Sequence, residues 1–170
     1  MIYVLHCQIT PGPKKERLEK AMRESAPYRT MTDTLWLIEA DLLPKEVEAE
    51  LQALTVKSFV APLHPNGPRG GKLLPADKEN QEILHIVHSE HLRDAEKEKL
   101  EKLVQDAGPA RKLTDSFWIF KAKTMPKELD AYLQALNTVS FAAPLHPQAQ
   151  CGGNLLAEDV EWIAMHTLKH

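Results

Sequence analysis

TDTLWLIEADLLPKEVEAELQALTVKSFVAPLHPNGPRGGKLL, residues 32–74, decides the fold because a near copy follows it in the same chain. The copy, TDSFWIFKAKTMPKELDAYLQALNTVSFAAPLHPQAQCGGNLL, occupies residues 114–156, always 82 positions later and without a gap. The same offset reaches back to His6 and His88 and forward to Asp77 and Asp159. The duplication predicts two copies of one structural unit, so each feature has to be examined in both copies.

Each copy carries the same order of predicted elements. Alternating or continuous apolar runs indicate strands, and apolar residues at helical spacing indicate helices. In the first copy we expect strands at residues 1–9, 29–31, 35–40 and 58–63, and helices at 14–25 and 45–54. In the second copy we expect strands at 83–88, 117–122 and 140–145, helices at 92–107 and 127–136, and a strand or helix in the tail, 158–170.

This βαββαβ order predicts an α+β protein built from two tandem ferredoxin-like repeats, residues 1–78 and 83–170. Each repeat would form a four-stranded antiparallel sheet with both helices on one face. A unit of about 80 residues is marginally stable alone. We therefore expect the two bare sheet faces to cover each other, giving a monomer with an internal pseudo-twofold dimer.

Composition and charge limit the classes of partner. Hydrophobic residues make up 43% of the chain and charged residues 26%, which is ordinary for a globular protein. The net charge of −3 provides no global positive field, so nucleic acid is possible but not favoured as a partner. No apolar run is long enough to span a bilayer, and the first residues lack the features of a signal peptide. No membrane partner is expected.

The two cysteines do not form a duplicated framework. Cys7 corresponds to Ser89 in the other repeat, and Cys151 corresponds to Arg69. Neither a duplicated disulfide set nor a duplicated metal set is therefore indicated, and a reduced, cytoplasmic setting is the simpler interpretation.

A duplicated loop is the first candidate site. Each copy carries His-Pro followed by Gly-Gly; histidine titrates near neutral pH, and paired glycines allow close backbone approach to a ligand. The alternative is that His-Pro ends a strand and Gly-Gly makes a turn that the fold requires. The candidate binding residues of the two loops are His64, Arg69, Gly70, Gly71, His146, Gly152 and Gly153.

Other matched pairs supply further candidates. His6 and His88 each end a first strand, where a buried histidine with a satisfied hydrogen bond competes with an acid–base role. Arg29 and Arg111 are candidate binding residues, although an ion pair with the aspartate across the same hairpin is the simpler interpretation. The histidines spaced by three around His88 would point to opposite faces of a strand, so no metal site is predicted, and no cofactor motif is present.

The strand TLWLIEAD, with the helix that follows Pro44, resembles the compact CRISPR adaptation subunit ("Cas-two") and its SinR-like relatives. That resemblance implies ferredoxin-like units working as dimers, here fused in one chain. Nuclease members of the family place an acidic metal-binding residue near the end of the first strand. The matching positions here hold Cys7 and Gln8 in the first repeat, and Ser89 and Glu90 in the second. Only Glu90 is acidic, so a duplicated acidic site is missing. A second resemblance is to dimeric α/β-barrel proteins, which pair two such sheets around an apolar pocket.

These observations lead to three functional hypotheses. The first is a non-catalytic binding or assembly protein that recognises a ligand or macromolecular partner through the inter-repeat cleft and the duplicated loops. The second is an enzyme, either a divergent metal-dependent endonuclease or a small-molecule enzyme of the barrel type, with His6 and His88 as acid–base groups. The third is a purely structural subunit of a larger assembly.

Overall fold

The computed structural model describes residues 1–64, 82–136, 138–146 and 151–167. The first half contains β1 (Ile2–Cys7), α1 (Pro13–Ser25), β2 (Tyr28–Thr30), β3 (Leu35–Glu39), α2 (Lys45–Ala53) and β4 (Ser58–Pro62). The second half contains β5 (Ile83–Ser89), α3 (Asp94–Ala107), β6 (Ala110–Thr114), β7 (Phe117–Ala122), α4 (Lys127–Ala135), β8 (Ser140–Pro144) and α5 (Ala157–His166).

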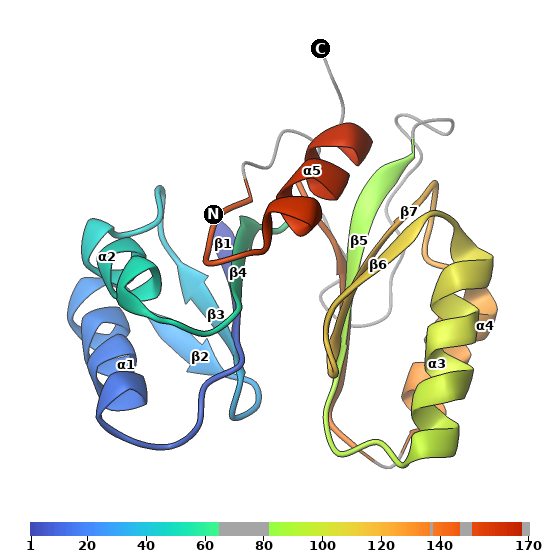
Figure 1. Ribbon diagram of the computed structural model, residues 1–170, viewed down its shortest axis with the longest axis horizontal. Helices are drawn as coiled ribbons and strands as arrows, with labels where there is room; N and C mark the ends of the chain where they lie inside the picture. The colour runs from blue at the N-terminus through green and yellow to red at the C-terminus, as the bar shows by residue number, and fades with distance from the viewer. Residues whose placement is uncertain (65–81, 137, 147–150, 168–170) are drawn as a thin grey trace.

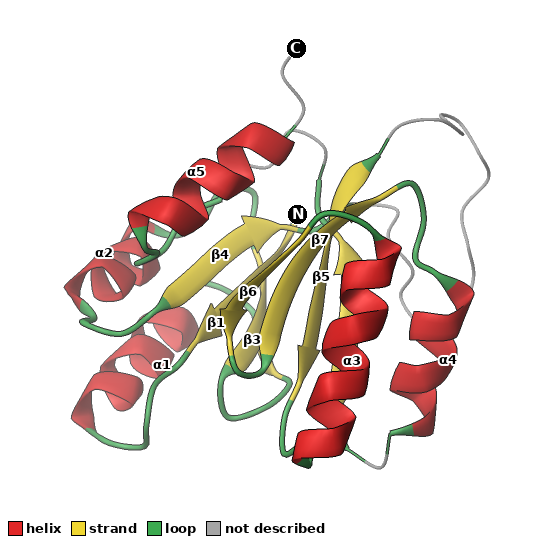
Figure 2. Cartoon of the chain, turned by 45° about the vertical axis from the view of Figure 1, so that its right-hand side comes forward, coloured by secondary structure: helices red, strands yellow, loops and turns green. Residues whose placement is uncertain are grey.

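The two halves repeat one topology, which confirms the α+β fold of tandem ferredoxin-like repeats. All strand pairs are antiparallel, in the order β2-β3-β1-β4 in one sheet and β6-β7-β5-β8 in the other. The sheets face each other, and two helices cover the outer face of each (Figures 1 and 2). The tail forms helix α5, which lies between the halves at one end of their interface (Figure 1).

Alternation along the strands separates three hydrophobic clusters. In β1, Val4 faces the other sheet, whereas Leu5 and Cys7 face α1 and α2. The cluster between the sheets draws residues from both halves, so the halves share one interior. The two tryptophans of the duplicated strands lie in the helix-side clusters: Trp36 in the first half and Trp118 in the second.

The halves also pair directly through their backbones. Beyond the ends of β4 and β8, Leu63 and Leu145 form an antiparallel bridge. His64 donates its backbone N–H to the Pro144 carbonyl at 3.0 Å, and His146 donates to the Pro62 carbonyl at 3.0 Å. These two bonds exchange places under the 82-residue offset, so the pseudo-twofold axis passes between them.

A segment of the second half extends the first sheet. Gly152 donates to the Val60 carbonyl at 2.8 Å and accepts from the Val60 N–H at 3.0 Å. Two residues later, Asn154 accepts the Ser58 N–H at 3.1 Å and donates to the Ser58 hydroxyl at 2.8 Å. The edge of β4 is covered in this way, and all five residues of β4 are buried. None of the helices in the described ranges has the length and apolarity that a bilayer span requires.

We predict that Phe117→Ala lowers the free energy of unfolding by about 3–5 kcal/mol, because this buried ring packs on Phe59 across the interface. Since the halves share this interior, urea unfolding followed by circular dichroism should remain a single transition. The control is Leu42→Ala, at a side chain that is 79% exposed, which should change stability little. Two separate transitions, with only one shifted, would contradict a common core.

Candidate functional site

Two buried histidines meet at the centre of the interface and tie the repeats together. His6 Nε2 lies 3.0 Å from Thr114 Oγ1, and His88 Nε2 lies 3.2 Å from Thr32 Oγ1. The two bonds are equivalent under the 82-residue offset, and each joins one repeat to the other. The imidazole centroids are 5.3 Å apart. The candidate acid–base pair is therefore brought together, within hydrogen-bonding reach of threonines.

Glu90 makes this centre asymmetric. Its Oε1 accepts hydrogen bonds from the Thr32 hydroxyl at 2.7 Å and from the Thr34 hydroxyl, and lies 3.5 Å from His88 Nε2. Because the single Thr32 hydroxyl proton is directed to Glu90, His88 Nε2 must donate to the Thr32 oxygen. The equivalent residue in the first repeat, Gln8, is exposed. The acid that the family resemblance implies at this position is thus present in the second repeat alone, where it accepts hydrogen bonds from Thr32 and Thr34 of the first.

Burial keeps both histidines neutral. It lowers the pKa of His6 to about 3, with the neighbouring His88 adding to the effect. It lowers the pKa of His88 to about 4, against the opposing influence of Glu90. A general acid or base works best with a pKa near the operating pH and with contact to substrate. Both side chains are shielded from solvent, so this arrangement favours structural roles for His6 and His88.

The duplicated loops begin at the pseudo-twofold axis. The His64 and His146 rings lie side by side, with centroids 6.2 Å apart and planes inclined by 27°. Partial burial lowers the pKa of His64, and the charge of His146 acts in the same direction. The structure therefore brings together two candidate residues from different repeats. Arg69, Gly70 and Gly71 lie outside the described residues.

The glycines of the second loop have a clear structural use. Gly153 has φ of +111°, and a Cβ added there would lie 2.3 Å from the Ser58 carbonyl oxygen. Gly152 forms an antiparallel bridge with Val60. This Gly-Gly pair thus lets the second half run along the edge of β4, as the alternative interpretation of the motif required. Ligand binding by these glycines stays a prediction.

Arg111 belongs to an ionic cluster around the buried Asp159 that the sequence did not reveal. Its Nε donates to Asp159 Oδ1 at 2.7 Å, and its guanidinium lies 2.9 Å from Glu158. Lys57, from the first repeat, lies 3.2 Å from Asp159 Oδ2 and also donates to the Leu113 carbonyl. Asp159 is fully buried, so α5 is held between cations of both repeats. The recurrence of aspartate at positions 77 and 159 is the sequence feature that could have pointed to this cluster.

The prediction that an arginine and an aspartate pair across each hairpin was wrong. Asp33 pairs with Lys15 at 3.2 Å, and Asp115 pairs with Lys112 at 3.4 Å. Arg111 instead reaches α5, which the hairpin alone could not reveal. Arg29, its counterpart, has an exposed side chain and no ion pair with any of the residues that the structure describes.

Arg29 lines a groove of about 840 Å³ between the repeats. One wall comes from β2 and β3 of the first half, and the other from β8 of the second. The lining is mainly apolar, including Met31, Leu37 and Phe141, with His64 at one edge. We call this space the inter-repeat groove.

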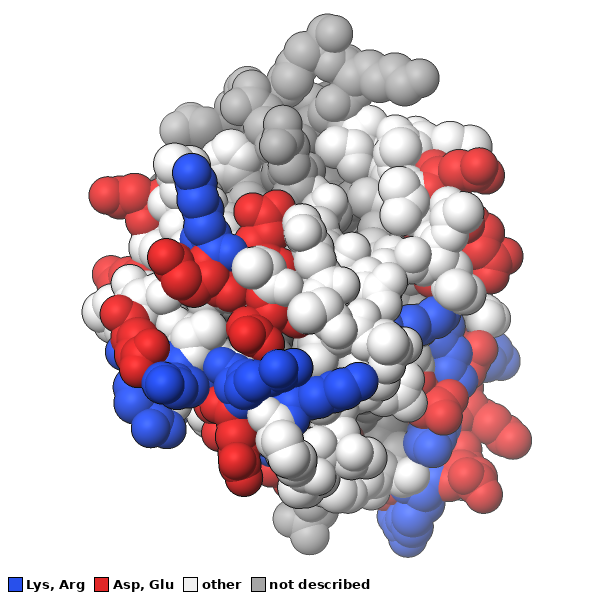
Figure 3. Space-filling view, turned by 60° about the vertical axis from the view of Figure 1, so that its left-hand side comes forward, with Lys and Arg blue, Asp and Glu red and all other residues white. Residues whose placement is uncertain are grey.

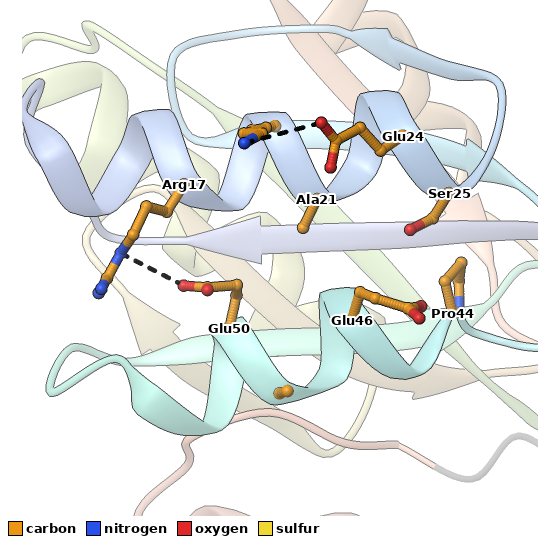
Figure 4. Close-up of a pocket in the computed structure, with 9 residues that line it drawn as sticks. Arg17, Ala21, Glu24, Ser25, Pro44, Glu46 and Glu50 are labelled. Atoms are coloured by element: carbon orange, nitrogen blue, oxygen red, sulfur yellow. Dashed lines mark ion pairs between the residues drawn. The ribbon is translucent and has the colours of Figure 1, made fainter.

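A second hollow, of about 820 Å³, lies on the outer face between α1 and α2 (Figure 4). Four of its charged residues form two ion pairs: Arg17 lies 3.6 Å from Glu50, and Lys20 lies 3.8 Å from Glu24. Glu46 forms no ion pair with the residues that the structure describes. Nothing in this hollow selects a ligand. Within the described ranges, no group of three or more histidine, cysteine or acidic residues is placed to hold a metal ion.

No protein-family model matches this sequence, and a search of curated proteins finds none that matches it. The resemblances to the Cas-two and SinR-like proteins and to the dimeric α/β-barrel proteins therefore stay predictions.

We predict that Gly153→Ala destabilises the protein by about 2–4 kcal/mol, because it adds a backbone clash to an unfavourable positive φ. Gly12→Ala is a suitable control, since Gly12 also has positive φ but has no atom within 4 Å of an added Cβ. Its cost should be about 1 kcal/mol. Chemical denaturation measures both changes in the free energy of unfolding. Equal decreases would show that the close approach to β4 is not the reason why position 153 holds glycine.

Acid should destabilise the fold through its buried histidines. The folded-state pKa values are about 3 for His6 and about 4 for His85 and His88, below the usual 6.5. Between these values and 6.5 the unfolded chain binds more protons, so stability falls as pH decreases, by up to about 1.4 kcal/mol per pH unit for each histidine.

Urea denaturation near pH 7.5 and near pH 5.5 should therefore differ by about 3–4 kcal/mol, with the lower stability in acid. Replacing His85 by Leu removes one of the three groups and should reduce this difference by about a third. Unchanged stability between the two pH values would contradict the burial of neutral histidines.

Proposed function

We propose that this protein is a non-catalytic binding or assembly protein that recognises a ligand or macromolecular partner at the cleft between its repeats. One observation carries the proposal: the inter-repeat groove, an apolar space of about 840 Å³ with Arg29 at its wall. Apolar grooves with a few placed polar groups are the usual form of a binding site. His64, at the start of the first duplicated loop, lies at the edge of this groove.

The character of the groove supports a protein or other partly apolar partner rather than nucleic acid. Nucleic-acid sites present many cations along the phosphate backbone, whereas the described residues of this lining include one arginine, Arg29, no lysine, and the acidic Glu39. The face seen in Figure 3 mixes acidic and basic side chains without a field of one sign. A partner that buries apolar surface and offers one acidic group would complement the groove.

The enzyme alternatives have less support. A metal-dependent endonuclease would need Glu90 available to a metal ion, but Glu90 is engaged by Thr32, Thr34 and His88. A barrel-type enzyme would need its acid–base groups in a pocket between the sheets, but the described lining of the inter-repeat groove includes neither His6 nor His88. The matched histidines are buried and have pKa values far below neutrality.

The proposal is tested by native mass spectrometry of the protein purified from its own host. Met31→Glu, which places a charge in the inter-repeat groove, should reduce the co-purifying partner by about tenfold or more, because the charge would have to be desolvated. Met165→Glu, at an exposed methionine on α5, is the matched control and should retain the partner.

Thermal melting should show that both variants are folded. If Met31→Glu fails to fold, Phe141→Ser at the opposite wall of the groove replaces it. Equal retention of the partner by the groove variant and the control, or no partner with the wild-type protein, would refute the proposal.

A further inference from the structure

Helix α5 occupies one side of the interface between the repeats and docks there through one face. Its Ile163 enters the cluster between the sheets, and its Trp162 packs against that cluster. Its Asp159 binds Arg111 and Lys57. The helix thus uses an acidic residue in its first turn and apolar residues three and four positions later, which share one helical face.

The inter-repeat groove is the pseudo-symmetric counterpart of the place where α5 docks. Five residues of the groove wall correspond, through the 82-residue offset, to residues that pair with α5 or belong to the cluster that Ile163 of α5 enters. The pairs are Arg29 with Arg111, Met31 with Leu113, Leu37 with Ile119, Phe141 with Phe59, and Ala143 with Ala61. The chain therefore presents the same kind of surface twice, and α5 covers one copy.

Exposure differs between the two copies as this relation requires. Leu113, Ile119 and Phe59 are at most 2% exposed. Their counterparts, Met31, Leu37 and Phe141, are only partly buried. β4, whose edge is covered by the segment 152–154 that leads into α5, has every residue buried, whereas only one of the five residues of β8 is buried. Among the residues that the structure describes, similar apolar side chains are thus buried on the α5 side and only partly buried in the groove.

The sequence of the first repeat lacks the apolar pair through which α5 docks. Residues 75–84 correspond to α5 by the repeat offset, but the last two of them already belong to β5. Asn80 and Gln81 stand where α5 has Trp162 and Ile163, so the apolar docking pair is absent. An aspartate is retained at position 77. Without the apolar pair, however, the segment lacks the side chains that would bury the apolar wall of the groove.

We infer that the inter-repeat groove binds an amphipathic helix of a partner protein. Like α5, this helix carries an aspartate or glutamate in its first turn, which pairs with Arg29, and bulky apolar residues three and four positions later. The inference rests on the proposed binding function and specifies its partner. Lys57, the second cation of the α5 site, corresponds to Val139, so the partner's acid meets one cation rather than two.

The probe is a fluorescently labelled, N-acetylated peptide with the sequence of residues 154–166, added to the full protein and followed by anisotropy. It should bind the wild-type protein saturably. Arg29→Glu should weaken binding by about tenfold or more, because the charge-assisted bond becomes a repulsion. Arg23→Glu, at an exposed arginine on α1 outside the groove, should leave binding unchanged.

Two peptide variants separate the parts of the interaction. Replacing the tryptophan and isoleucine of the peptide by serine should abolish binding, since the apolar face supplies most of the affinity. Replacing its first-turn aspartate by arginine should weaken binding to the wild-type protein but restore it to Arg29→Glu. This reciprocal rescue would not arise from a merely structural effect of Arg29.

Four outcomes would overturn the inference. They are absence of peptide binding, equal binding to Arg29→Glu and wild type, binding that appears only after Asp77→Asn, and concentration-dependent dimerisation lost in Arg29→Glu. The third would assign the groove to the chain's own segment, and the fourth to a second copy. If the peptide fails to bind while Met31→Glu still loses the host partner, the binding function stands and only the helical nature of the partner is refuted.

Discussion

The burial of two apolar sheet faces against each other is the constraint on which the rest of the structure depends. In each repeat, two helices cover one face of the sheet and leave the other apolar face without a partner. That face is satisfied by the sheet of the other repeat, through a cluster drawn from both halves. The backbone bridges of Leu63 with Leu145 and of Val60 with Gly152 join the two halves directly beside this cluster.

The Nε2 atoms of two buried histidines are paired across this interface, where water is excluded. His6 reaches Thr114, and His88 reaches Thr32, so each repeat supplies the hydrogen-bond partner of the other's histidine. The arrangement makes the histidines part of the fold's specificity. It also buries them, which explains why these titratable side chains are not available to a ligand at the surface.

Fusion of the repeats allowed the two sides of the interface to diverge. In a homodimer, a symmetry axis would require both sides to be covered or both to be open. In this single chain, α5 covers one side, and Asp159 links it to Arg111 and Lys57. The other side keeps Arg29 and an apolar wall. The functional proposals arise from this broken symmetry, because an occupied site beside its open counterpart indicates what the open one can hold.

The duplication, the order of elements and the pairing of the sheets could be predicted from the sequence, because they follow from local periodicity and from the need to bury an apolar face. The residues that recur in both repeats could also be found in the sequence, but the contacts that each of them makes could not be predicted from it. Gly153 is required by β4, and Arg111 by α5, through contacts between residues far apart in the chain. The sequence by itself thus determined two equivalent units. Only the tertiary structure decided which residues close the interface and which line a groove, because that depends on where the tail lies after the sheets have met.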